Sequence, residues 1–328
     1  MEQFFAQIDR ITRYSYWFMF IMFILVGALG LGTPFLTVFF SLFVMRHLIF
    51  GGRRNLAALI FIALVIAIFT CFVLFLRHAN EVLPKVIATS IPTLAKYAED
   101  WGIQLPFEDV NGLKEFLMGS VHEELAQVAN FAKLATKEFL FLIVGLVVAC
   151  SIFLGRSLEK DPTSSGDLYS TVCCKVNARF RTLYGSFETV IGAQIIISAI
   201  NSVLTAVFVF LAGVPHPLLI ITITFLCGLL PIVGNLISNS VIVGVASTSS
   251  PQLAIASLTY LVVVHKFEYF LNSKIIGSRI KNPMWLTLLG LLVGEKIMGI
   301  PGMIMAPVVL HYFKVEASGI PVQSPTDL

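Results

Sequence analysis

Long apolar runs alternate with short polar or glycine- and proline-rich segments along the whole chain. Three runs fill most of the first 77 residues, at 15–30, 34–50 and 56–76, and the third has no charged residue before Arg77. A transmembrane helix needs about 20 apolar residues in succession, so the third run predicts a span. The first two runs meet at a Gly-Leu-Gly-Thr-Pro turn, 30–34, and therefore predict a helical hairpin.

Residues 78–137 differ from the runs on either side because acidic side chains are frequent in them. From Leu113 onwards, apolar residues recur at spacings of three and four, which is the period of an amphipathic helix. Such helices lie on a membrane face or rise from it, and packing between subunits would use the same pattern. The region is predicted to be helical and amphipathic.

The remainder of the chain contains the densest apolar sequence. A fourth run, 138–155, ends at Gly155 and is followed by a polar segment, 156–184, which is predicted to be a loop. Four further runs predict spans, at 187–212, 217–231, 235–248 and 252–270. The last apolar block, 284–313, is interrupted at 299–302 and is either two spans or a re-entrant hairpin.

The segment 228–235, Gly-Leu-Leu-Pro-Ile-Val-Gly-Asn, lies in the middle of this apolar sequence. Pro231 has no backbone N–H and Gly234 has no Cβ, so a helix through the segment is expected to break or kink. A break inside a membrane frees carbonyl groups that need polar partners, and broken helices often line substrate or ion sites in transporters. A simple turn between two spanning helices is an equally good interpretation.

The composition is that of a membrane protein. Hydrophobic residues make up 57% of the 328 residues, charged residues only 12%, and the mean hydropathy is +0.89. Soluble domains carry about 25% charged residues, so this chain cannot build the usual solvated surface. We predict an all-α polytopic membrane protein with about eight transmembrane or re-entrant helical segments and an extracytoplasmic amphipathic helical region.

Signatures of other protein classes are missing from the sequence. There is no basic stripe with stacking aromatic residues, so nucleic-acid binding is not expected. A zinc protease would need a second histidine four residues after His122, where Ala126 stands, and neither a phosphate-binding loop nor a nucleophile elbow occurs. The five cysteines contain no CxxC pair and are expected to be reduced. We therefore expect no enzyme activity, no cofactor and no metal.

The distribution of basic residues predicts the orientation. With the N-terminus in the cytoplasm, the Lys- and Arg-rich loops at 46–54, 156–184 and 271–283 lie inside and the acidic region lies outside, so both termini are cytoplasmic. This topology divides the chain into five parts: 1–77, the N-terminal hairpin and third span; 78–137, the extracytoplasmic amphipathic region; 138–184, the fourth span and a cytoplasmic loop; 185–315, a C-terminal transport core; and 316–328, a cytoplasmic tail.

Two carboxylates are candidate functional residues. Glu268 lies near the end of an apolar span, where an ionisable group is costly unless it is paired, protonated or hydrated. Such a group would suit proton coupling, whereas a pair with Lys266 or Lys274 would make it structural. Glu295 is the second candidate, with a salt bridge to Lys296 as the structural alternative.

Uncharged polar residues form a second group of candidates. Asn235 follows the break, and Asn239 lies one helical turn further on. Ser198 and Ser202 share one side of the fifth span with two further polar residues, and such residues either line a pathway or hydrogen-bond neighbouring helices. The residues assigned to a substrate or ion pathway are Gln194, Asn201, Pro231, Gly234, Asn235, Glu268 and Glu295. Those assigned to gating or helix breaks are Gly299, Pro301 and Gly302.

Several short motifs follow one another in the C-terminal half. They are Gly192 with Gln194, Gly213-Val214-Pro215, Pro231-Ile232-Val233-Gly234, Glu268, Ile275-Ile276-Gly277, Pro283, Gly299-Ile300-Pro301-Gly302-Met303 and Ala306-Pro307. In this order and spacing, residues 187–313 resemble the autoinducer-2 exporter family of bacterial membrane transporters. The charges of Glu295 and Lys296 and the lack of a proline in 275–277 depart from the family pattern, and they leave the substrate open.

The resemblance implies a multi-pass transporter of the bacterial cell inner membrane that exports autoinducer-2 or another small solute. It implies lipid and a small-molecule or ion substrate as partners, and a homo-oligomer, with a pentamer as the implied assembly. Because some family members resemble antiporters in activity, a sodium (lithium)/proton antiporter with Glu268 as the titrating group is the alternative. A membrane scaffold protein without transport activity, which recruits an envelope partner through 78–137, is a third hypothesis.

The two predicted breaks, at Pro231 and at 299–302, lie on either side of Glu268 in the sequence. If both breaks open towards the cytoplasm, they would converge on one vestibule with this carboxylate. Proximity of Pro231 and Gly299 in space is the geometric requirement of that hypothesis.

Overall fold

The structure is a computed structural model that describes residues 10–75, 77, 124–156, 158, 167–230, 233–275 and 283–319. Within these ranges it describes only the backbone at 124–135, 233, 235, 236, 268–275 and 284. The chain divides into two compact units. Unit 1 comprises Met1–Ala63, Thr136–Gly192 and Gly277–Leu328, and unit 2 comprises Leu64–Ala135 and Ala193–Ile276.

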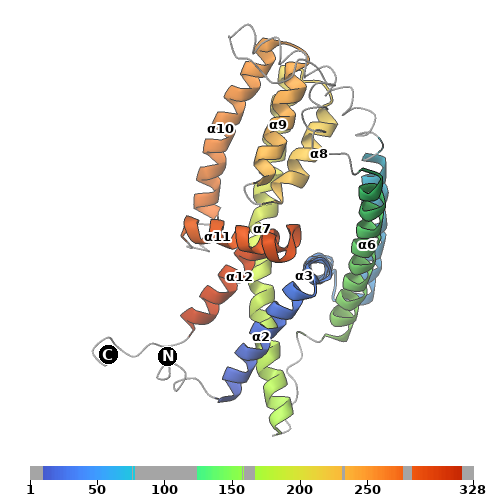
Figure 1. The fold of residues 1–328 in the computed structure, drawn as a ribbon, viewed down its shortest axis with the longest axis vertical. Coiled ribbons are helices and arrows are strands. Elements are labelled where there is room, and N and C mark those ends of the chain that lie inside the picture. The colour runs from blue at the N-terminus through green and yellow to red at the C-terminus, as the bar shows by residue number, and fades with distance from the viewer. Residues whose placement is uncertain are drawn as a thin grey trace, which may run out of the picture. The chain divides into compact units, whose positions relative to one another are not determined.

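Helices account for nearly all of the described residues, and no strand occurs among them. The helices are α2 (Arg10–Ala28), α3 (Gly32–His47), α6 (Glu124–Gly155), α7 (Leu168–Ala212), α8 (Pro217–Gly228), α9 (Val233–Ser247), α10 (Pro251–Ile275), α11 (Met284–Met298) and α12 (Ile300–Ser318), with one more at Arg54–Phe75 (Figure 1). Four of them are long and apolar enough to cross a membrane: α2, Arg54–Phe75, the Thr136–Gly155 part of α6, and α7. The predicted all-α polytopic fold is confirmed.

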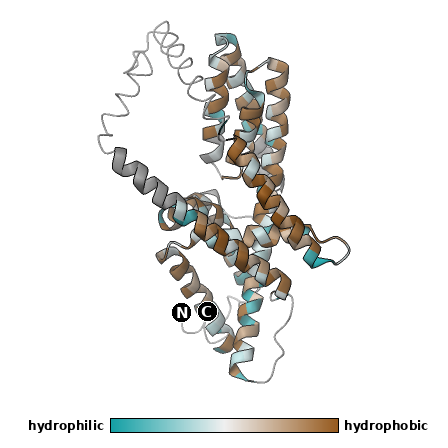
Figure 2. Cartoon of the chain, turned by 90° about the vertical axis from the view of Figure 1, so that its right-hand side faces the viewer, coloured by the Kyte–Doolittle hydropathy of each residue, from teal (hydrophilic) through white to brown (hydrophobic). Residues whose placement is uncertain are grey.

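Most residues of these helices are hydrophobic, as the predominantly brown ribbon in Figure 2 shows, and many large apolar side chains are exposed. Ile66 on the helix Arg54–Phe75, Val147 on α6 and Leu211 on α7 are 61%, 64% and 84% exposed. Water would not tolerate so much apolar surface, whereas the hydrocarbon core of a bilayer solvates it. The exposed faces are therefore faces for lipid or for a partner in the membrane.

The polar loop predicted over 156–184 is shorter than expected. Helix α7 begins at Leu168 and runs without interruption to Ala212, so the loop prediction is wrong for 168–184. The reason is visible in the apolar positions of this stretch, which recur every three or four residues and give a helix one buried face. These positions, which are partly or fully buried, are Val172, Val176, Phe180 and Leu183. The many charged residues of this stretch suggest a loop, whereas the spacing of its apolar residues indicates a helix.

Helix α8 is shorter than the predicted run 217–231, and α9 is about as short as the predicted run 235–248. They contain 12 and 15 residues, which at 1.5 Å per residue is about 18 and 23 Å against about 30 Å of hydrocarbon. Neither is long enough to span a bilayer alone. They lie side by side as a hairpin (Figure 1), and its turn coincides with the predicted break at 228–235.

Unit 2 has an apolar core where the end of α7 meets this hairpin. Its buried residues come from α7, the following turn, α8 and α9: Val209, Val214, Ile220, Ile242, Val245 and Ala246. Gly213, at φ +68°, makes the tight turn after α7, and the N–H of Val214 donates to the carbonyl of Val209 at 3.0 Å. A left-handed glycine of this kind is a common helix stop. The core therefore fixes α8 and α9 against the second half of α7.

Unit 1 is held together by aromatic rings and one buried ion pair. Phe187 of α7 lies 5.4 Å from Phe39 and 5.2 Å from Phe40 of α3, measured between ring centroids. Arg179 of α7 forms an ion pair with Glu316 of α12. Their side chains are 18% and 7% exposed, so the pair is largely withdrawn from solvent.

The last apolar block is two helices separated by a one-residue break. Gly299 has φ +63° and ends α11, and α12 starts at Ile300 with Pro301 in its first turn. The two helices pack closely through Gly294 and Gly302. A Cβ on Gly302 would lie 1.9 Å from the carbonyl oxygen of Gly294, so neither position has room for a side chain. The small-residue pattern in this block is a helix contact.

Replacing Gly302 by alanine is expected to destabilise the protein by about 1–3 kcal/mol, because the added methyl group forces the two backbones apart. Gly290→Ala is the matched control in the same helix pair. There the new Cβ would meet Cδ1 of Leu310 at 2.9 Å, a side-chain end that can rotate away. Thermal unfolding midpoints in detergent measure the difference. Equal midpoints for the two variants would contradict the close packing of α11 on α12.

Candidate functional site

Polar side chains form a stripe along the unit 2 part of α7. Gln194, Ser198, Asn201, Ser202 and Thr205 follow one another at spacings of one to four residues, and all are at least partly buried. Residues at spacings of three and four share one face of a helix. The stripe therefore places hydrogen-bonding groups inside unit 2, on the side of α7 that faces the hairpin and α10.

The first half of this stripe completes the end of α8. The side-chain amide of Gln194 donates to the carbonyl of Gly228 at 2.6 Å, and the hydroxyl of Ser198 donates to the carbonyl of Phe225 at 2.7 Å. The last carbonyls of a helix have no partner within it, and in a membrane they cannot turn to water. Gln194 and Ser198 thus satisfy the carbonyl groups that the break was expected to free.

The turn between α8 and α9 is built on close backbone contacts. The N–H of Leu230 donates to the carbonyl of Cys227 at 2.8 Å. A Cβ on Gly234 would lie 1.7 Å from that same carbonyl oxygen, and a Cβ on Gly228 would lie 2.4 Å from Oγ of Ser198. Both positions require glycine because neighbouring atoms occupy the space of a side chain. The sequence prediction that Gly234 belongs to the break is consistent with this geometry.

The second half of the stripe lines a small cavity between α7, α8, α9 and α10. Its volume is about 20 Å³, which is room for a water-sized group. The lining residues are Asn201, Thr205, Thr224, Ser238, Asn239, Ile242, Tyr260, Leu261, Val264 and His265. Most of these side chains are polar, although the surrounding helix surfaces are apolar.

Two buried polar atoms in this cavity have no hydrogen-bond partner among the described residues. They are Oδ1 of Asn201 and Oγ1 of Thr224, in residues that are 5% and 7% exposed. An unsatisfied buried polar group costs about 1–3 kcal/mol. Two of them facing one polar cavity indicate a place where a water molecule, a cation or a polar group of a solute binds.

Helix α10 closes the cavity with an ordered tyrosine. The ring of Tyr260 stacks on Phe208 of α7 at 4.1 Å between centroids and 7° between planes, and its hydroxyl donates to Oγ1 of Thr205 at 3.1 Å. A tyrosine held at both ends keeps one rotamer, so it forms a firm wall. His265, which lies about one helical turn after Tyr260 on α10, adds an imidazole group to the cavity lining.

The residues predicted from the sequence fall into several places. Asn201 lines the cavity, and Gln194 and Gly234 shape the hairpin beside it. Pro231 lies outside the described residues. Asn235 and Glu268 lie on α9 and α10, but their side chains are outside the description. Their part in a pathway stays a prediction.

The other predicted residues belong to unit 1. Glu295 and Lys296 are exposed on α11 and form no ion pair with each other, so the salt bridge expected between them is not present. Gly299 and Gly302 form the α11–α12 break and contact described above, and Pro301 starts α12. Because the two breaks belong to different compact units, their convergence on one vestibule stays a prediction.

Sequence reasoning missed most of the cavity wall. Thr205 could have been found, because it continues the α7 stripe one turn beyond Asn201. Thr224 on α8 and Tyr260 on α10 are distant from Asn201 along the chain, and only the packing of the helices brings them to one cavity with it. No group of three or more His, Cys, Asp or Glu side chains suited to a metal ion occurs in the described part of the chain.

Helices with apolar outer faces, a half-length hairpin and a polar cavity together define a polytopic α-helical membrane protein with an internal polar cavity. The family model for AI-2E family transporters matches residues 14–317, nearly the whole chain. The chain therefore belongs to the AI-2E family of transporters.

One curated relative supports the same class. The chain is 29% identical over 122 residues to a protein of Bacillus subtilis (strain 168) named "Putative transport protein YdbI". The matched segment is 37% of this chain and 35% of the relative, so the similarity spans about a third of the length of each. No solved structure matches.

Proposed function

We propose that this transporter exports a small polar solute across the bacterial inner membrane, and that the unit 2 cavity is part of its pathway. The observation that carries the proposal is the pair of unpartnered atoms, Asn201 Oδ1 and Thr224 Oγ1, in a polar cavity between apolar helices. A transporter site must bind a polar solute without water, so it presents donors and acceptors that only the solute completes.

The cavity as described is too small for a whole solute. A volume of about 20 Å³ holds one water-sized group, whereas sites for small molecules measure about 300 Å³ or more. We propose that this conformation is a closed one and that the cavity widens when a solute binds. The α8–α9 hairpin is the element proposed to move, because it is too short to span the membrane and contributes one wall.

Small and mainly uncharged lining groups favour a neutral polyol-like solute over an anion. The hydroxyl groups of Thr205, Thr224 and Ser238 and the amides of Asn201 and Asn239 donate and accept hydrogen bonds, and they carry no charge. Autoinducer-2, which the family is named for, belongs to this chemical class. The antiporter alternative depends on Glu268, whose side chain is outside the description, and it is not proposed.

The test is efflux of autoinducer-2 and of a panel of small polyols from vesicles containing the purified protein. Asn201→Leu and Thr224→Val keep the side-chain size and remove the polar atoms. Each is expected to reduce efflux at least about tenfold, the equivalent of one lost hydrogen bond to the solute.

Thr259→Val is the matched control for this experiment. It removes the same hydroxyl from an exposed position on α10, where that hydroxyl donates to the carbonyl of Ile255 within the same helix. Efflux should stay at the unmodified rate. Equal losses in Thr224→Val and Thr259→Val, or no efflux of any solute by the unmodified protein, would refute the proposed pathway.

The orientation is a separate proposal, supported by the positive-inside distribution of Lys and Arg. Both termini are placed in the cytoplasm. In inside-out vesicles, single cysteines introduced in a cysteine-free chain at residues 8 and 322 should react with a membrane-impermeant maleimide, and in intact spheroplasts they should not. Labelling in the reverse pattern would invert the topology.

A further inference from the structure

A buried hydroxyl group on α10 lies just beyond the residues that line the unit 2 cavity. Ser257 is 0% exposed, and its Oγ has no hydrogen-bond partner among the described residues. Hydroxyl groups inside a helix can donate to the carbonyl four residues earlier. Thr259, two positions further on, does so with Ile255 at 3.0 Å, whereas Ser257 makes no such bond. Its hydroxyl therefore lacks the partner that a buried polar group needs.

Ser257 belongs to the face of α10 that packs into unit 2. Leu253 and Leu261, four residues before and four residues after it, both pack against the apolar core of this unit. Residues four apart share one face of a helix. The next two positions, Leu258 and Thr259, are exposed. The hydroxyl of Ser257 is therefore on the inner face of α10 and not on its lipid-facing side.

The cavity begins about one helical turn further along α10. Tyr260 and Leu261 line it, and they follow Ser257 by three and four residues, which is about 5 Å along the helix axis. Leu261 lines the cavity and also packs against the apolar core, and Ile242 of α9 belongs to both as well. Ser257 thus lies at the level where the polar cavity gives way to the apolar core.

The other helices of unit 2 pass from the cavity into the core within about one turn. Thr205 of α7 lines the cavity, and Val209, four residues on, is in the core. On α8, Thr224 lines the cavity and Ile220, four residues earlier, is in the core. The apolar core therefore closes the cavity on the side where α7 ends and α8 begins.

We propose that Ser257 is a second hydrogen-bonding position for the transported solute, which the solute reaches when it leaves the cavity towards the apolar core. This inference rests on the proposed function. A hydroxyl group both donates and accepts, so it can replace a hydrogen bond that a neutral polar solute gives up at Asn201 or Thr224. Helix α10 leads towards the loop 271–283, which the proposed orientation places in the cytoplasm. Ser257 then lies on the exit side of the cavity.

Ser257→Ala separates this role from a structural one, because the two roles change stability in opposite directions. Removing a hydroxyl that supports the fold lowers the unfolding midpoint, whereas removing an unsatisfied buried hydroxyl raises it. We expect a thermal unfolding midpoint in detergent about 2 °C higher than that of the unmodified protein. Solute efflux from vesicles should fall about fivefold, the equivalent of one hydrogen bond. Unchanged efflux, or a lower midpoint, overturns the proposal.

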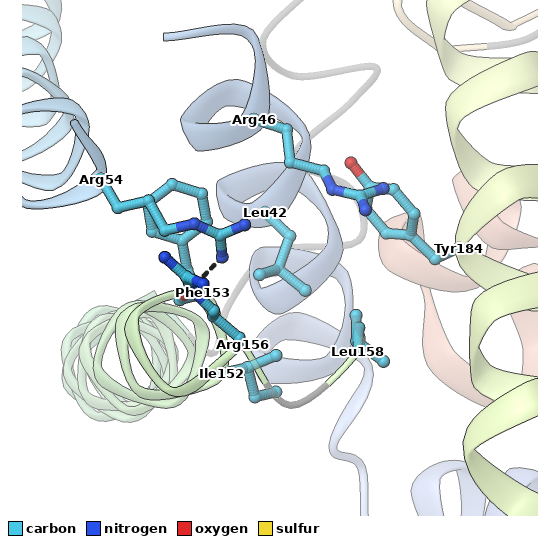
Figure 3. A pocket seen from close by; sticks show the side chains of 8 residues that line it. All are labelled: Leu42, Arg46, Arg54, Ile152, Phe153, Arg156, Leu158 and Tyr184. Atoms are coloured by element: carbon cyan, nitrogen blue, oxygen red, sulfur yellow. Dashed lines mark hydrogen bonds between the residues drawn. The ribbon is translucent and has the colours of Figure 1, made fainter. Parts of the chain in front are cut away.

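Ser186→Ala is the matched control for Ser257→Ala. Ser186 lies on α7 in unit 1, is 2% exposed, and its Oγ also has no partner among the described residues. Two residues before it, Tyr184 packs beside Arg46 of α3, whose guanidinium lies 4.8 Å from the centroid of the tyrosine ring (Figure 3). The control should raise the midpoint by a similar amount and leave efflux unchanged. An equal loss of efflux in both variants overturns the proposal.

Cysteine accessibility tests the same position without a known solute. Ser257→Cys and Ser186→Cys are introduced separately into a cysteine-free chain, and vesicles are treated with a small water-soluble methanethiosulfonate reagent. The thiol at position 257 should react at least about tenfold faster than the thiol at position 186, because a minor state with a widened cavity admits water only along the pathway. Equal rates overturn the proposal. Faster reaction at 257 without efflux of any tested solute supports the position and refutes the proposed solutes.

Discussion

Replacing Glu316 by alanine is expected to lower the free energy of unfolding by about 3–5 kcal/mol, because it leaves a buried arginine without its counter-charge. The carboxylate of Glu316 pairs with Arg179 and accepts a hydrogen bond from the hydroxyl of Tyr16 at 3.1 Å. Arg179 also lies 4.4 Å from the centroid of the Tyr16 ring. One carboxylate thus connects α12 to α7 and α2 within unit 1.

The measurement is the unfolding midpoint in detergent, and the matched control is Glu295→Ala, which removes an exposed carboxylate from the neighbouring helix α11. That control should change stability by less than about 0.5 kcal/mol. The double variant Arg179→Met with Glu316→Leu should recover most of the loss, because a buried ion pair replaced by apolar groups of similar size is often neutral. A Glu316→Ala midpoint equal to that of Glu295→Ala would show that the pair contributes nothing.

Replacing Gly234 by alanine is expected to abolish transport and to destabilise unit 2 by about 3 kcal/mol or more, at the upper end for overpacking. The added Cβ would lie 1.7 Å from the carbonyl oxygen of Cys227, and a backbone atom cannot rotate away as a side chain can. The hairpin turn would have to open. Opening it displaces the end of α8, which Gln194 and Ser198 hold through the carbonyls of Gly228 and Phe225.

Gly244→Ala is the matched control for that experiment, because it lies on the same helix with no atom within 4 Å of the added Cβ. It should keep full efflux, with stability within about 1 kcal/mol of the unmodified protein. Efflux from vesicles and unfolding midpoints separate the two effects. Normal efflux in Gly234→Ala would show that the turn geometry is not required for transport.

The gross organisation of the chain follows from its sequence. Apolar run length predicts the helices, because every spanning segment must satisfy its own backbone in lipid, and charge asymmetry predicts an orientation. The interruptions of the helices at 228–235 and at Gly299 can also be predicted from the sequence, because glycine and proline act locally on the backbone. The first part of α7, which begins at Leu168, could also have been predicted, because its apolar residues recur at spacings of three and four.

Only the tertiary structure decides which polar residues form a site. Asn201 could be singled out from the sequence, but Thr224 and Tyr260 join it in one cavity from helices that are distant along the chain. Arg179 and Glu316 are separated by 137 positions, and nothing local pairs them. Lone polar residues in apolar helices look alike in sequence, because their partners depend on how the helices pack. Length and period are local properties, whereas a binding site is a property of the packing.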